Sequence, residues 1–280
     1  MKLLTSDNLG DFELLDTGAG YRLEQWGRFR LARPDPQIIW QKHMEEKEWE
    51  RAHAVFSDEQ RNWNANSLPK SWEVNLVGIK MLARLSPFKH TGIFPEQAAN
   101  WQWMAQRNLN PKSKILNLFG YTGGATIALT KAGHFMTHVD ASKPAISWAK
   151  ENQKLNNLPD DSIRWILDDA IKFVKRELKR GQKYDGIVMD PPAFGHSPTG
   201  KTWKFNHDLP KLLADCVQLL SKDAKFLLIN GYATNSSALA LKNLLEDAMN
   251  APSGVEFGEL CLKQKDQRLI STGIFARWSR

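Results

Sequence analysis

The pattern of apolar and polar positions changes along the chain. From residue 114 onward, short apolar runs of strand length alternate with segments of helical periodicity. The apolar runs cover residues 114–119, 135–140, 162–167, 184–190 and 224–231, and the helical segments cover residues 125–133, 144–157, 170–181 and 209–220. This alternation predicts βαβ units, and therefore a parallel sheet covered by helices.

The two ends of the chain have a different pattern. Residues 255–263 and 269–278 are apolar with no helical segment between them, which predicts an antiparallel hairpin at the sheet edge. Near the N-terminus, residues 21–34 and 71–87 alternate around glycines, as is typical of hairpins. We therefore expect a small β-rich domain over residues 1–89 and an α/β domain over residues 90–280.

Composition narrows the class of protein. With 280 residues, of which 42% are hydrophobic and 25% charged, the chain resembles ordinary globular proteins. It has no run of about 18 apolar residues and turns polar at Thr5, so we expect neither a membrane span nor a signal peptide, and a cytoplasmic location. Cys216 and Cys261 lack metal-binding spacing, so we expect no metal site and two buried thiols.

Charge is distributed unevenly. The net charge is +7, and because the first 110 residues carry equal numbers of acidic and basic side chains, all of the excess lies in residues 111–280. An excess of this kind favours a polyanionic partner such as RNA, although charge alone does not establish one.

The ends of the predicted parallel strands carry the candidate chemistry, because ligands of open parallel sheets bind there. The first strand runs into Phe119-Gly120-Tyr121-Thr122-Gly123-Gly124, where glycines permit a sharp turn and close approach to a ligand. Its order is G-x-x-G-G, which matches neither the dinucleotide fingerprint nor a P-loop. Alone, it is also compatible with a turn that binds nothing.

Acidic residues follow the next two strands. Asp140 ends the second strand, where a carboxylate can accept hydrogen bonds from ribose hydroxyls. Asp168, Asp169 and Ala170 follow the third, where a carboxylate and a backbone amide can contact an adenine edge. The structural alternative in both places is a helix N-cap, for which Ser142 is the better candidate in the first case.

The most specific segment is Asp190-Pro191-Pro192-Ala193-Phe194, after the fourth strand. Two prolines stiffen the loop and remove two amide donors, so that Asp190 and backbone carbonyls can act as acceptors while Phe194 offers a stacking face.

Together, residues 117–124, 139–152, 168–174 and 189–195 resemble the class I S-adenosylmethionine-dependent methyltransferases, which have a Rossmann-like sheet. Within that class they resemble the bacterial large-subunit ribosomal RNA methyltransferases I and K, with similarity from about residue 90 to the end of the chain. The resemblance implies S-adenosylmethionine as cofactor and RNA, ribosomal RNA above all, as substrate.

The resemblance also implies site residues. Phe119 to Gly124 would surround the methionine part of the cofactor, and Asp140, with Ala141 and Ser142 beside it, would hold the ribose. Asp169 and Ala170 would meet the adenine, and Asp190 to Phe194 would line the methyl-transfer site. The segment from Gly92 to Gln97 resembles the family's lid over the cofactor.

Two departures from the family pattern concern the target atom. Members that methylate carbon 5 of cytosine carry a cysteine after the fifth strand, but residues 228–233 contain none. Members that methylate amino groups have an aromatic residue directly after the second proline, where this chain has Ala193. We therefore expect direct transfer to a nitrogen or oxygen without a cysteine adduct, and the sequence leaves the choice of atom open.

Residues after the proline loop are candidates for substrate contacts. Lys201 and Lys204, with Trp203 between them, fit a phosphate-plus-stacking contact, and His196 and His207 are candidate bases; a solvated loop is the alternative. Two rival functions remain at this stage: a nicotinamide-dependent oxidoreductase, and a non-catalytic RNA-binding protein on a methyltransferase scaffold.

Overall fold

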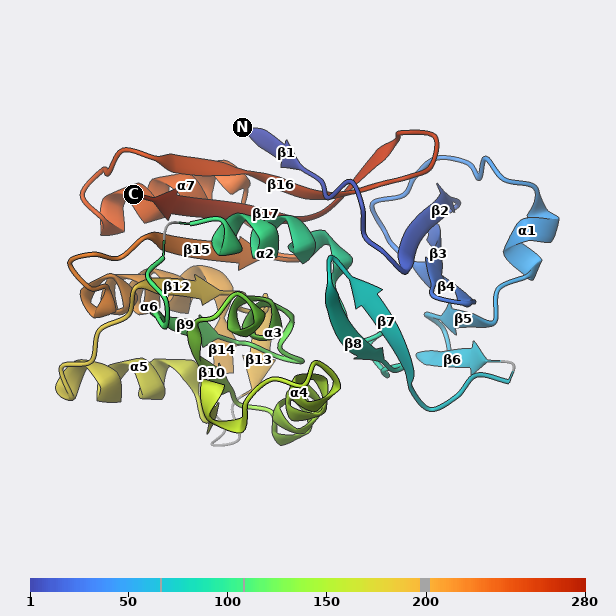
Figure 1. The fold of residues 1–280 in the computed structure, drawn as a ribbon. Coiled ribbons are helices and arrows are strands. Elements are labelled where there is room, and N and C mark those ends of the chain that lie inside the picture. The colour runs from blue at the N-terminus through green and yellow to red at the C-terminus, as the bar shows by residue number, and fades with distance from the viewer. Residues whose placement is uncertain (66, 108, 197–201) are drawn as a thin grey trace. The chain divides into compact units, whose positions relative to one another are not determined.

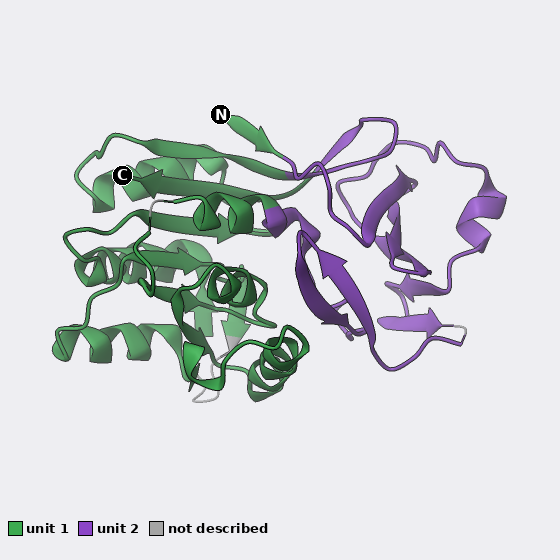
Figure 2. Cartoon of the chain, in the orientation of Figure 1, with its two compact units in different colours: residues 1–4, 99–260, 271–280 green, residues 5–98, 261–270 purple. Residues whose placement is uncertain are grey.

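The structure, a computed structural model, describes residues 1–65, 67–107, 109–196 and 202–280. The chain divides into two compact units (Figure 2). Unit 1 comprises residues 1–4, 99–260 and 271–280, and unit 2 comprises residues 5–98 and 261–270. Relative to the expected boundary after residue 89, residues 90–98 lie in unit 2. So does the end of the C-terminal hairpin, because Gln264 hydrogen-bonds to Asp16 and Thr17 of that unit.

Unit 1 is built on an eight-stranded sheet in the order β1-β16-β17-β15-β12-β9-β10-β11 (Figure 1). Its parallel strands are β9 (Lys114–Leu118), β10 (Phe135–Asp140), β11 (Ile163–Leu167), β12 (Gly186–Met189) and β15 (Phe226–Gly231). β17 (Leu269–Ser279) pairs antiparallel with β15, and β16 (Val255–Lys263) follows it in the sheet. This confirms the predicted α/β class, with a mostly parallel sheet and antiparallel C-terminal strands.

The edge strand β1 (Lys2–Leu4) was not predicted from the sequence. It pairs parallel with β16, with Leu3 opposite Glu259. Its three residues are too few to show the alternation by which a strand is recognised.

Helices connect the strands of unit 1. They are α2 (Ala98–Ala105), α3 (Gly124–Lys131), α4 (Lys143–Leu155), α5 (Ala170–Lys179), α6 (Phe205–Leu219) and α7 (Ala238–Ala248), with a short 3₁₀ helix, η2 (Asp160–Ser162). α6 contacts both α5 and α7, and these helices share a core with the central strands that includes Phe173, Leu213, Leu245 and Cys216. Cys216 is therefore buried, as predicted.

Unit 2 is mostly β. Its five-stranded sheet consists of β2 (Phe12–Gly18), β3 (Tyr21–Trp26), β4 (Phe29–Pro34), β5 (Ala54–Ser57) and β6 (Asn62–Ala65), in that order. A separate hairpin is formed by β7 (Trp72–Leu76) and β8 (Ile79–Ala83), and two short helices, α1 (Glu46–Glu50) and η1 (Pro95–Gln97), complete the unit. Both predicted hairpins are present, turning at Gly27 and Gly78 with positive φ angles, which glycine adopts readily.

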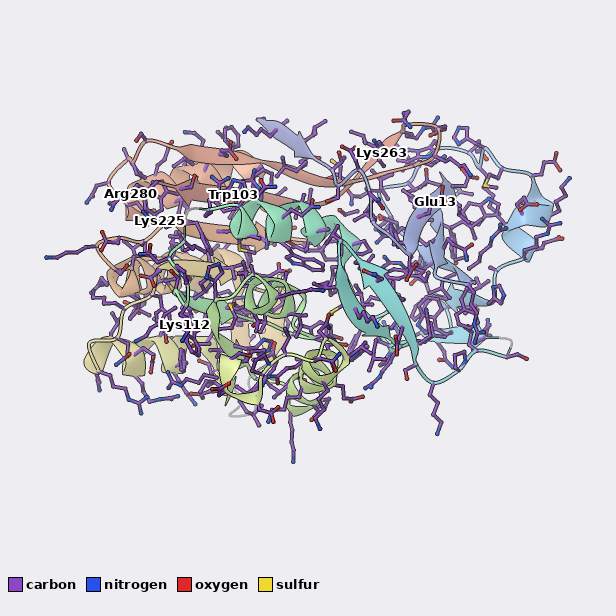
Figure 3. The ribbon with its side chains drawn as sticks, viewed as in Figure 1. Glu13, Trp103, Lys112, Lys225, Lys263 and Arg280 are labelled. Atoms are coloured by element: carbon purple, nitrogen blue, oxygen red, sulfur yellow. The ribbon has the colours of Figure 1, made fainter. Side chains whose placement is uncertain are left out.

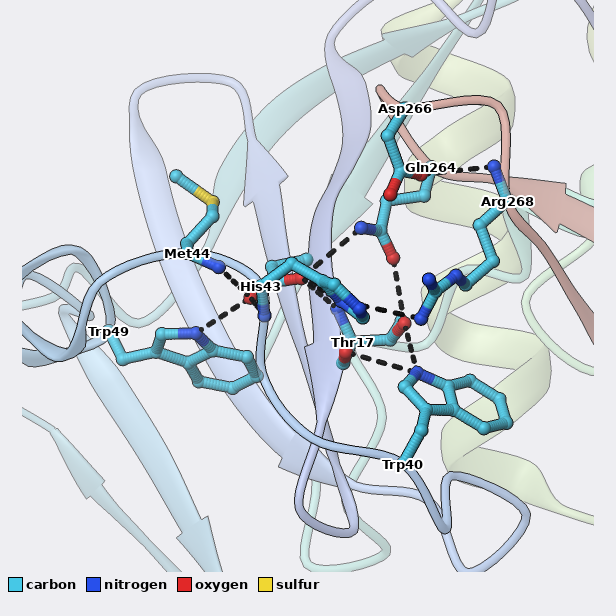
Figure 4. Close-up of polar contacts among 9 residues, drawn as sticks. Thr17, Trp40, His43, Met44, Trp49, Gln264, Asp266 and Arg268 are labelled. Carbon is cyan, nitrogen blue, oxygen red and sulfur yellow. Dashed lines mark hydrogen bonds and ion pairs between the residues drawn. The ribbon is translucent and has the colours of Figure 1, made fainter.

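Figure 4 shows hydrogen bonds that join Thr17 of β2 to Trp40 and to Gln264 within unit 2. Asp16 is fully buried and accepts hydrogen bonds from the backbone amides of Thr17, His43 and Met44 and from the side chains of Trp49 and Gln264. A buried carboxylate is tolerated when its lone pairs are satisfied in this way. Asp16 therefore links β2 to residues 43–49 and to residue 264 near the other end of the chain.

Candidate functional site

The parallel strands of unit 1 bring five loops to one edge of the sheet. β15, β12, β9, β10 and β11 are successive neighbours and run in the same direction, so the residues after each strand meet at the carboxyl edge (Figure 1). These residues are 119–124, 140–142, 168–170, 190–194 and 231–233. The arrangement is the one in which open α/β sheets bind ligands.

The turn after β9 has an unusual backbone. Phe119 and Tyr121 have φ angles of 57° and 47°, and Gly123, the N-cap of α3, has a φ of 88°. Left-handed conformations of residues other than glycine cost energy and tend to occur at ligand sites. The left-handed conformations of Phe119 and Tyr121 are unfavourable by themselves, so contacts with the surrounding protein must stabilise this turn.

Two of its glycines are required by the packing of the protein itself. A Cβ atom on Gly120 would lie 2.4 Å from Cε1 of His138, and one on Gly124 would lie 2.4 Å from Cζ2 of Trp101. Sequence reasoning explained these glycines by close approach to a ligand, and the structure adds this second reason. His138 is itself fully buried, with Nδ1 2.9 Å from Thr126 Oγ1, and its burial lowers its pKa to about 3.

Asp140 joins the glycine turn to the end of β10. Its Oδ2 accepts a hydrogen bond from the Tyr121 amide at 2.9 Å, and its Oδ1 accepts one from the Ser142 amide at 2.8 Å. Burial raises the pKa of the Asp140 carboxyl, and these backbone hydrogen bonds oppose that effect. Because a carboxylate can accept about four hydrogen bonds and the Ala141 amide also contributes, Asp140 retains capacity for about one hydrogen bond from a ligand.

Ser142 has the structural role that the sequence suggested for it. Its Oγ accepts a hydrogen bond from the Ala145 amide at 3.3 Å, and it is the N-cap of α4. The Asp140 side chain is therefore not the N-cap of α4. Ala141 lies between the two, and its amide also contributes to stabilising the Asp140 carboxylate.

The acidic pair after β11 is occupied by protein contacts. Asp169 is the N-cap of α5 and accepts a hydrogen bond from the Lys172 amide at 3.0 Å. Asp168 accepts one from the Asp169 amide and forms an ion pair with Arg176. The capping interpretation therefore holds for Asp169, and contact of Asp169 and Ala170 with an adenine remains a prediction.

The loop after β12 is fixed from two sides. The Asp190 amide donates to the Leu118 carbonyl at 3.3 Å, which ties the loop to β9. The Trp203 indole donates to the Pro192 carbonyl at 2.7 Å, and the Phe205 amide donates to the Ala193 carbonyl at 3.2 Å. The sequence suggested backbone carbonyls of this loop as acceptors for a substrate. The carbonyls of Pro192 and Ala193 instead accept hydrogen bonds from the protein itself. Pro191 is buried, whereas Phe194 is 55% exposed.

Trp203 does not offer the exposed stacking face expected of it. Its side chain is only 9% exposed, and its ring lies 5.1 Å from that of Phe119. The Trp203 side chain is part of the hydrophobic core of unit 1. From there its indole N–H donates to the Pro192 carbonyl of the proline loop. Its contribution to the site is to position that loop.

The other candidates of this segment differ in their placement. Lys204 is exposed and pairs with Phe194 across the hairpin of β13 (Phe194–His196) and β14 (Thr202–Lys204). Lys201 lies outside the described residues, as does the side chain of His196. His207 is exposed on the first turn of α6, with Nδ1 3.0 Å from Asp208 Oδ1.

Not all of the positive charge of unit 1 lies near this edge. Lys112, Lys225 and Arg280, labelled in Figure 3, lie at the opposite, amino edge of the parallel strands, where the Arg280 amide donates to the Lys225 carbonyl at 3.1 Å. The charge excess of residues 111–280 is therefore spread over both edges.

A buried polar chain that sequence reasoning missed reaches the carboxyl edge. Asn230, near the end of β15, accepts a hydrogen bond from Asn100 Nδ2 at 2.9 Å, and Asn100 Oδ1 accepts one from Arg277 at 3.0 Å. Arg277 is in turn paired with Glu256. Asn230 lies one residue beyond the paired positions Met189 and Ile229, next to Asp190 across the sheet. The signal in the sequence was a polar residue inside the apolar run of residues 224–231.

The segment expected to form a lid belongs to unit 2. Gln97 ends η1, and its amide donates to the Phe94 carbonyl at 3.1 Å. Glu96 is buried, and burial raises the pKa of its carboxyl, an effect opposed by Arg22 and Arg33. The cofactor contact of Gln97 and the lid role of Gly92 to Gln97 remain predictions.

Among the described residues there is no group of three or more His, Cys, Asp or Glu side chains placed to hold a metal ion. No helix within the described ranges is long and apolar enough to cross a membrane.

The fold, and the polar residues at its strand ends, are typical of α/β proteins that bind a nucleoside-containing ligand at the carboxyl edge of the sheet. Residues 43–262 match the sequence model of a family described as S-adenosylmethionine-dependent methyltransferase. The chain belongs to this family. The resemblance to S-adenosylmethionine-dependent methyltransferases seen in the sequence is thus confirmed, and the nicotinamide-dependent oxidoreductase is set aside.

Individual relatives agree with this assignment. The chain is 29% identical over 198 residues to ribosomal RNA large subunit methyltransferase I of Shigella dysenteriae, covering 70% of this chain and 48% of that protein. The same enzyme of Escherichia coli strain SMS-3-5 matches with equal identity, over 70% of this chain and 49% of its own length. The chain thus spans about half the length of these curated relatives.

Solved structures are similar over more of their length. A methyltransferase of Agrobacterium tumefaciens described as S-adenosylmethionine-dependent has a TM-score of 0.94 and 39% identity, covering 100% of this chain and 93% of that one. The methyltransferase SMU.776, solved with S-adenosylhomocysteine, has a TM-score of 0.76 and 16% identity, covering 96% and 76%. At 16% identity the second likeness supports the fold alone.

Proposed function

We propose that this enzyme transfers a methyl group from S-adenosylmethionine to a nitrogen or oxygen of an RNA base, with ribosomal RNA as the substrate. The observation that carries the proposal is the stiff Asp190–Phe194 loop, fixed beside the glycine turn and presenting an exposed aromatic ring. Lys204 lies opposite that ring in the hairpin, where a phosphate contact would be made.

The residues at the carboxyl edge fit this cofactor. The glycine turn contains no basic side chain, and two carboxylates, Asp140 and Asp190, lie at the ends of strands on either side of β9. Carboxylates on either side of the turn favour a cationic ligand. When bound, S-adenosylmethionine supplies an activated methyl group on a positively charged sulfur.

The roles of the chain's own residues follow from their positions. We assign the methionine part of the cofactor to residues 119–124, the ribose to Asp140 with residues 141–142, and the adenine to residues 169–170. The Asp190 carboxylate then accepts a hydrogen bond from the N–H or O–H of the acceptor group, orients it for in-line attack and takes up the proton that this group loses as it gains the methyl, while Phe194 stacks on the base. Positioning of this kind is the main protein contribution that such a displacement requires.

A covalent enzyme adduct is not part of this mechanism. Cys216 is fully buried in α6, and burial raises the pKa of its thiol, which makes it a poor nucleophile. Cys261 is also buried and belongs to unit 2. With no thiolate at the carboxyl edge, attack on carbon 6 of a pyrimidine has no nucleophile, so a nitrogen or oxygen acceptor is favoured.

The choice of RNA rests on charge and on relatives. The net charge of +7 lies in residues 111–280, which form most of unit 1. The curated relatives at 29% identity are ribosomal RNA methyltransferases by name. Both observations favour a nucleic-acid substrate.

The proposal is tested by comparing the nucleosides of ribosomal RNA from cells with and without the gene, using mass spectrometry. We expect one methylated nucleoside to be missing without the gene and to return with the wild-type gene but not with Asp190→Ala. Identical ribosomal RNA nucleosides in cells with and without the gene would reject ribosomal RNA as the substrate.

A further inference from the structure

Two large aromatic side chains are exposed at the carboxyl edge of unit 1. Phe194, in the loop after β12, is 55% exposed, and Tyr232, directly after β15, is 42% exposed. β12 and β15 are adjacent parallel strands, paired in register from Gly186 and Phe226 to Met189 and Ile229. Both aromatic residues therefore follow neighbouring strands at the carboxyl edge, Tyr232 directly after β15 and Phe194 at the end of the loop that follows β12.

A third aromatic residue, Phe205, contacts the residues that precede Phe194 and Tyr232. The Phe205 amide donates to the carbonyl of Ala193, the residue before Phe194. A Cβ atom on Gly231, the residue before Tyr232, would lie 3.1 Å from Cζ of the same Phe205. Phe205 is buried, so the residues that precede Phe194 and Tyr232 both contact one residue of the core.

The backbone after Tyr232 is strained. Ala233 has a φ of 50°, a left-handed conformation that is unfavourable for an alanine. Among the strand ends at the carboxyl edge, only the glycine turn after β9 has described non-glycine residues in the same conformation, Phe119 and Tyr121. The turn at Tyr232 thus shares a feature of the segment that we assign to the cofactor.

We propose that Tyr232 is a substrate-binding and specificity-determining residue, which stacks on the face of one unpaired RNA base opposite to Phe194. This inference rests on the proposed function, since the base is the methyl acceptor beside Asp190. Two exposed aromatic side chains at this edge, one of them paired with the basic Lys204 in the hairpin, suit a flat ring attached to a phosphate backbone.

The stacking arrangement defines the substrate class. A base in a duplex is stacked on both of its faces, so aromatic side chains can hold it only after it has left the helix. The slot between Phe194 and Tyr232 therefore selects an unpaired or flipped base in a loop, a bulge or a single strand. Such a slot holds purines and pyrimidines alike, and the edge of the base is left to Asp190.

The test uses the full chain with S-adenosylhomocysteine and twelve-nucleotide single strands of oligoadenylate, oligocytidylate and oligouridylate, each carrying one 2-aminopurine. Stacking of this base on an aromatic ring quenches its fluorescence. We expect Tyr232→Leu to weaken binding of the best probe about tenfold and to reduce the quenching, because loss of one stacking contact has an effect of this size. Tyr232→Phe retains the ring and should stay within about twofold of wild type.

Phe135→Leu is the matched control. Phe135 is an aromatic residue of similar exposure, 40%, but it begins β10 and so lies at the amino edge of the sheet. We expect it to bind the probes as wild type does. Affinity for S-adenosylhomocysteine, measured by calorimetry, should be equal in all four proteins, which separates a substrate contact from a folding defect.

The outcomes distinguish this inference from the proposed function. Unchanged probe binding and quenching in Tyr232→Leu, or a wild-type protein that quenches none of the three probes, would overturn the role of Tyr232. Loss of S-adenosylhomocysteine binding in Tyr232→Leu would assign the residue to the cofactor side instead. Failure of the proposed function would appear separately, as unchanged ribosomal RNA nucleosides in cells without the gene.

Discussion

The backbone amide of Tyr121 donates a hydrogen bond to Asp140 Oδ2 at 2.9 Å, so the carboxylate that we assign to the ribose also fixes the turn that we assign to the methionine part of the cofactor. The two contacts are therefore coupled. A substitution at Asp140 removes a ligand contact and at the same time releases the turn.

This coupling gives the first prediction. Asp140→Ala should weaken S-adenosylmethionine binding by at least about 1.5 to 3 kcal/mol, the value of a hydrogen bond to a charged group, because turn and ribose contacts are lost together. Asp140→Asn retains one oxygen and should lose less. Titration calorimetry measures both, and equal affinity of wild type and Asp140→Ala would rule out the ribose assignment.

The second prediction concerns Gly120, whose added Cβ would meet the His138 ring at 2.4 Å. Gly120→Ala should lower the free energy of unfolding by about 1 to 3 kcal/mol, as expected for overpacking. Because the obstacle is a side chain, the same substitution in a His138→Ala background should cost clearly less. Urea denaturation of the four proteins measures the coupling, and strictly additive effects would show that the clash is not with His138.

The third prediction is a pH dependence. Burial lowers the pKa of His138 to about 3, whereas an imidazole in an unfolded chain titrates near its ordinary value of about 6.5. Between these values the unfolded chain binds a proton that the folded chain does not, so stability falls as the pH falls from about 6.5 toward 3. The loss amounts to at most about 1.4 kcal/mol per pH unit for this group.

The variant that isolates this group is His138→Gln. Its unfolding free energy should depend less steeply on pH than that of wild type between pH 7 and pH 5, and both proteins should retain the slope due to His90, whose pKa burial lowers to about 4. Parallel pH profiles from denaturant unfolding would show that His138 is not neutral in the folded state.

The fourth prediction is catalysis without a cysteine nucleophile. Both cysteines are buried, and burial raises the pKa of the Cys216 thiol. The double variant Cys216→Ala, Cys261→Ala should keep the methyl-transfer activity of wild type as long as it folds, which circular dichroism monitors. Trapping of a covalent complex between the wild-type enzyme and RNA containing 5-fluorocytosine would contradict the mechanism.

The order of strands and helices in unit 1 could be predicted because each parallel strand is an apolar run bounded by turn residues. That order also placed Asp140, Asp169 and Asp190 at strand ends. The burial of Trp203 could not, since an indole between two lysines in the sequence gives no indication that its N–H reaches the Pro192 carbonyl. The contact of Gln264 with Asp16 was also out of reach, because these residues are 248 positions apart.

The central claim is that the enzyme methylates a base of RNA, and the most direct measurement is transfer of tritium from methyl-labelled S-adenosylmethionine to ribosomal RNA from cells lacking the gene. After digestion to nucleosides, we predict that the label elutes with one base-methylated nucleoside and that Asp190→Asn reduces its amount at least about a hundredfold, about 2.7 kcal/mol of lost transition-state stabilisation. Binding of S-adenosylmethionine with label found in protein, or in no RNA fraction, would contradict the account.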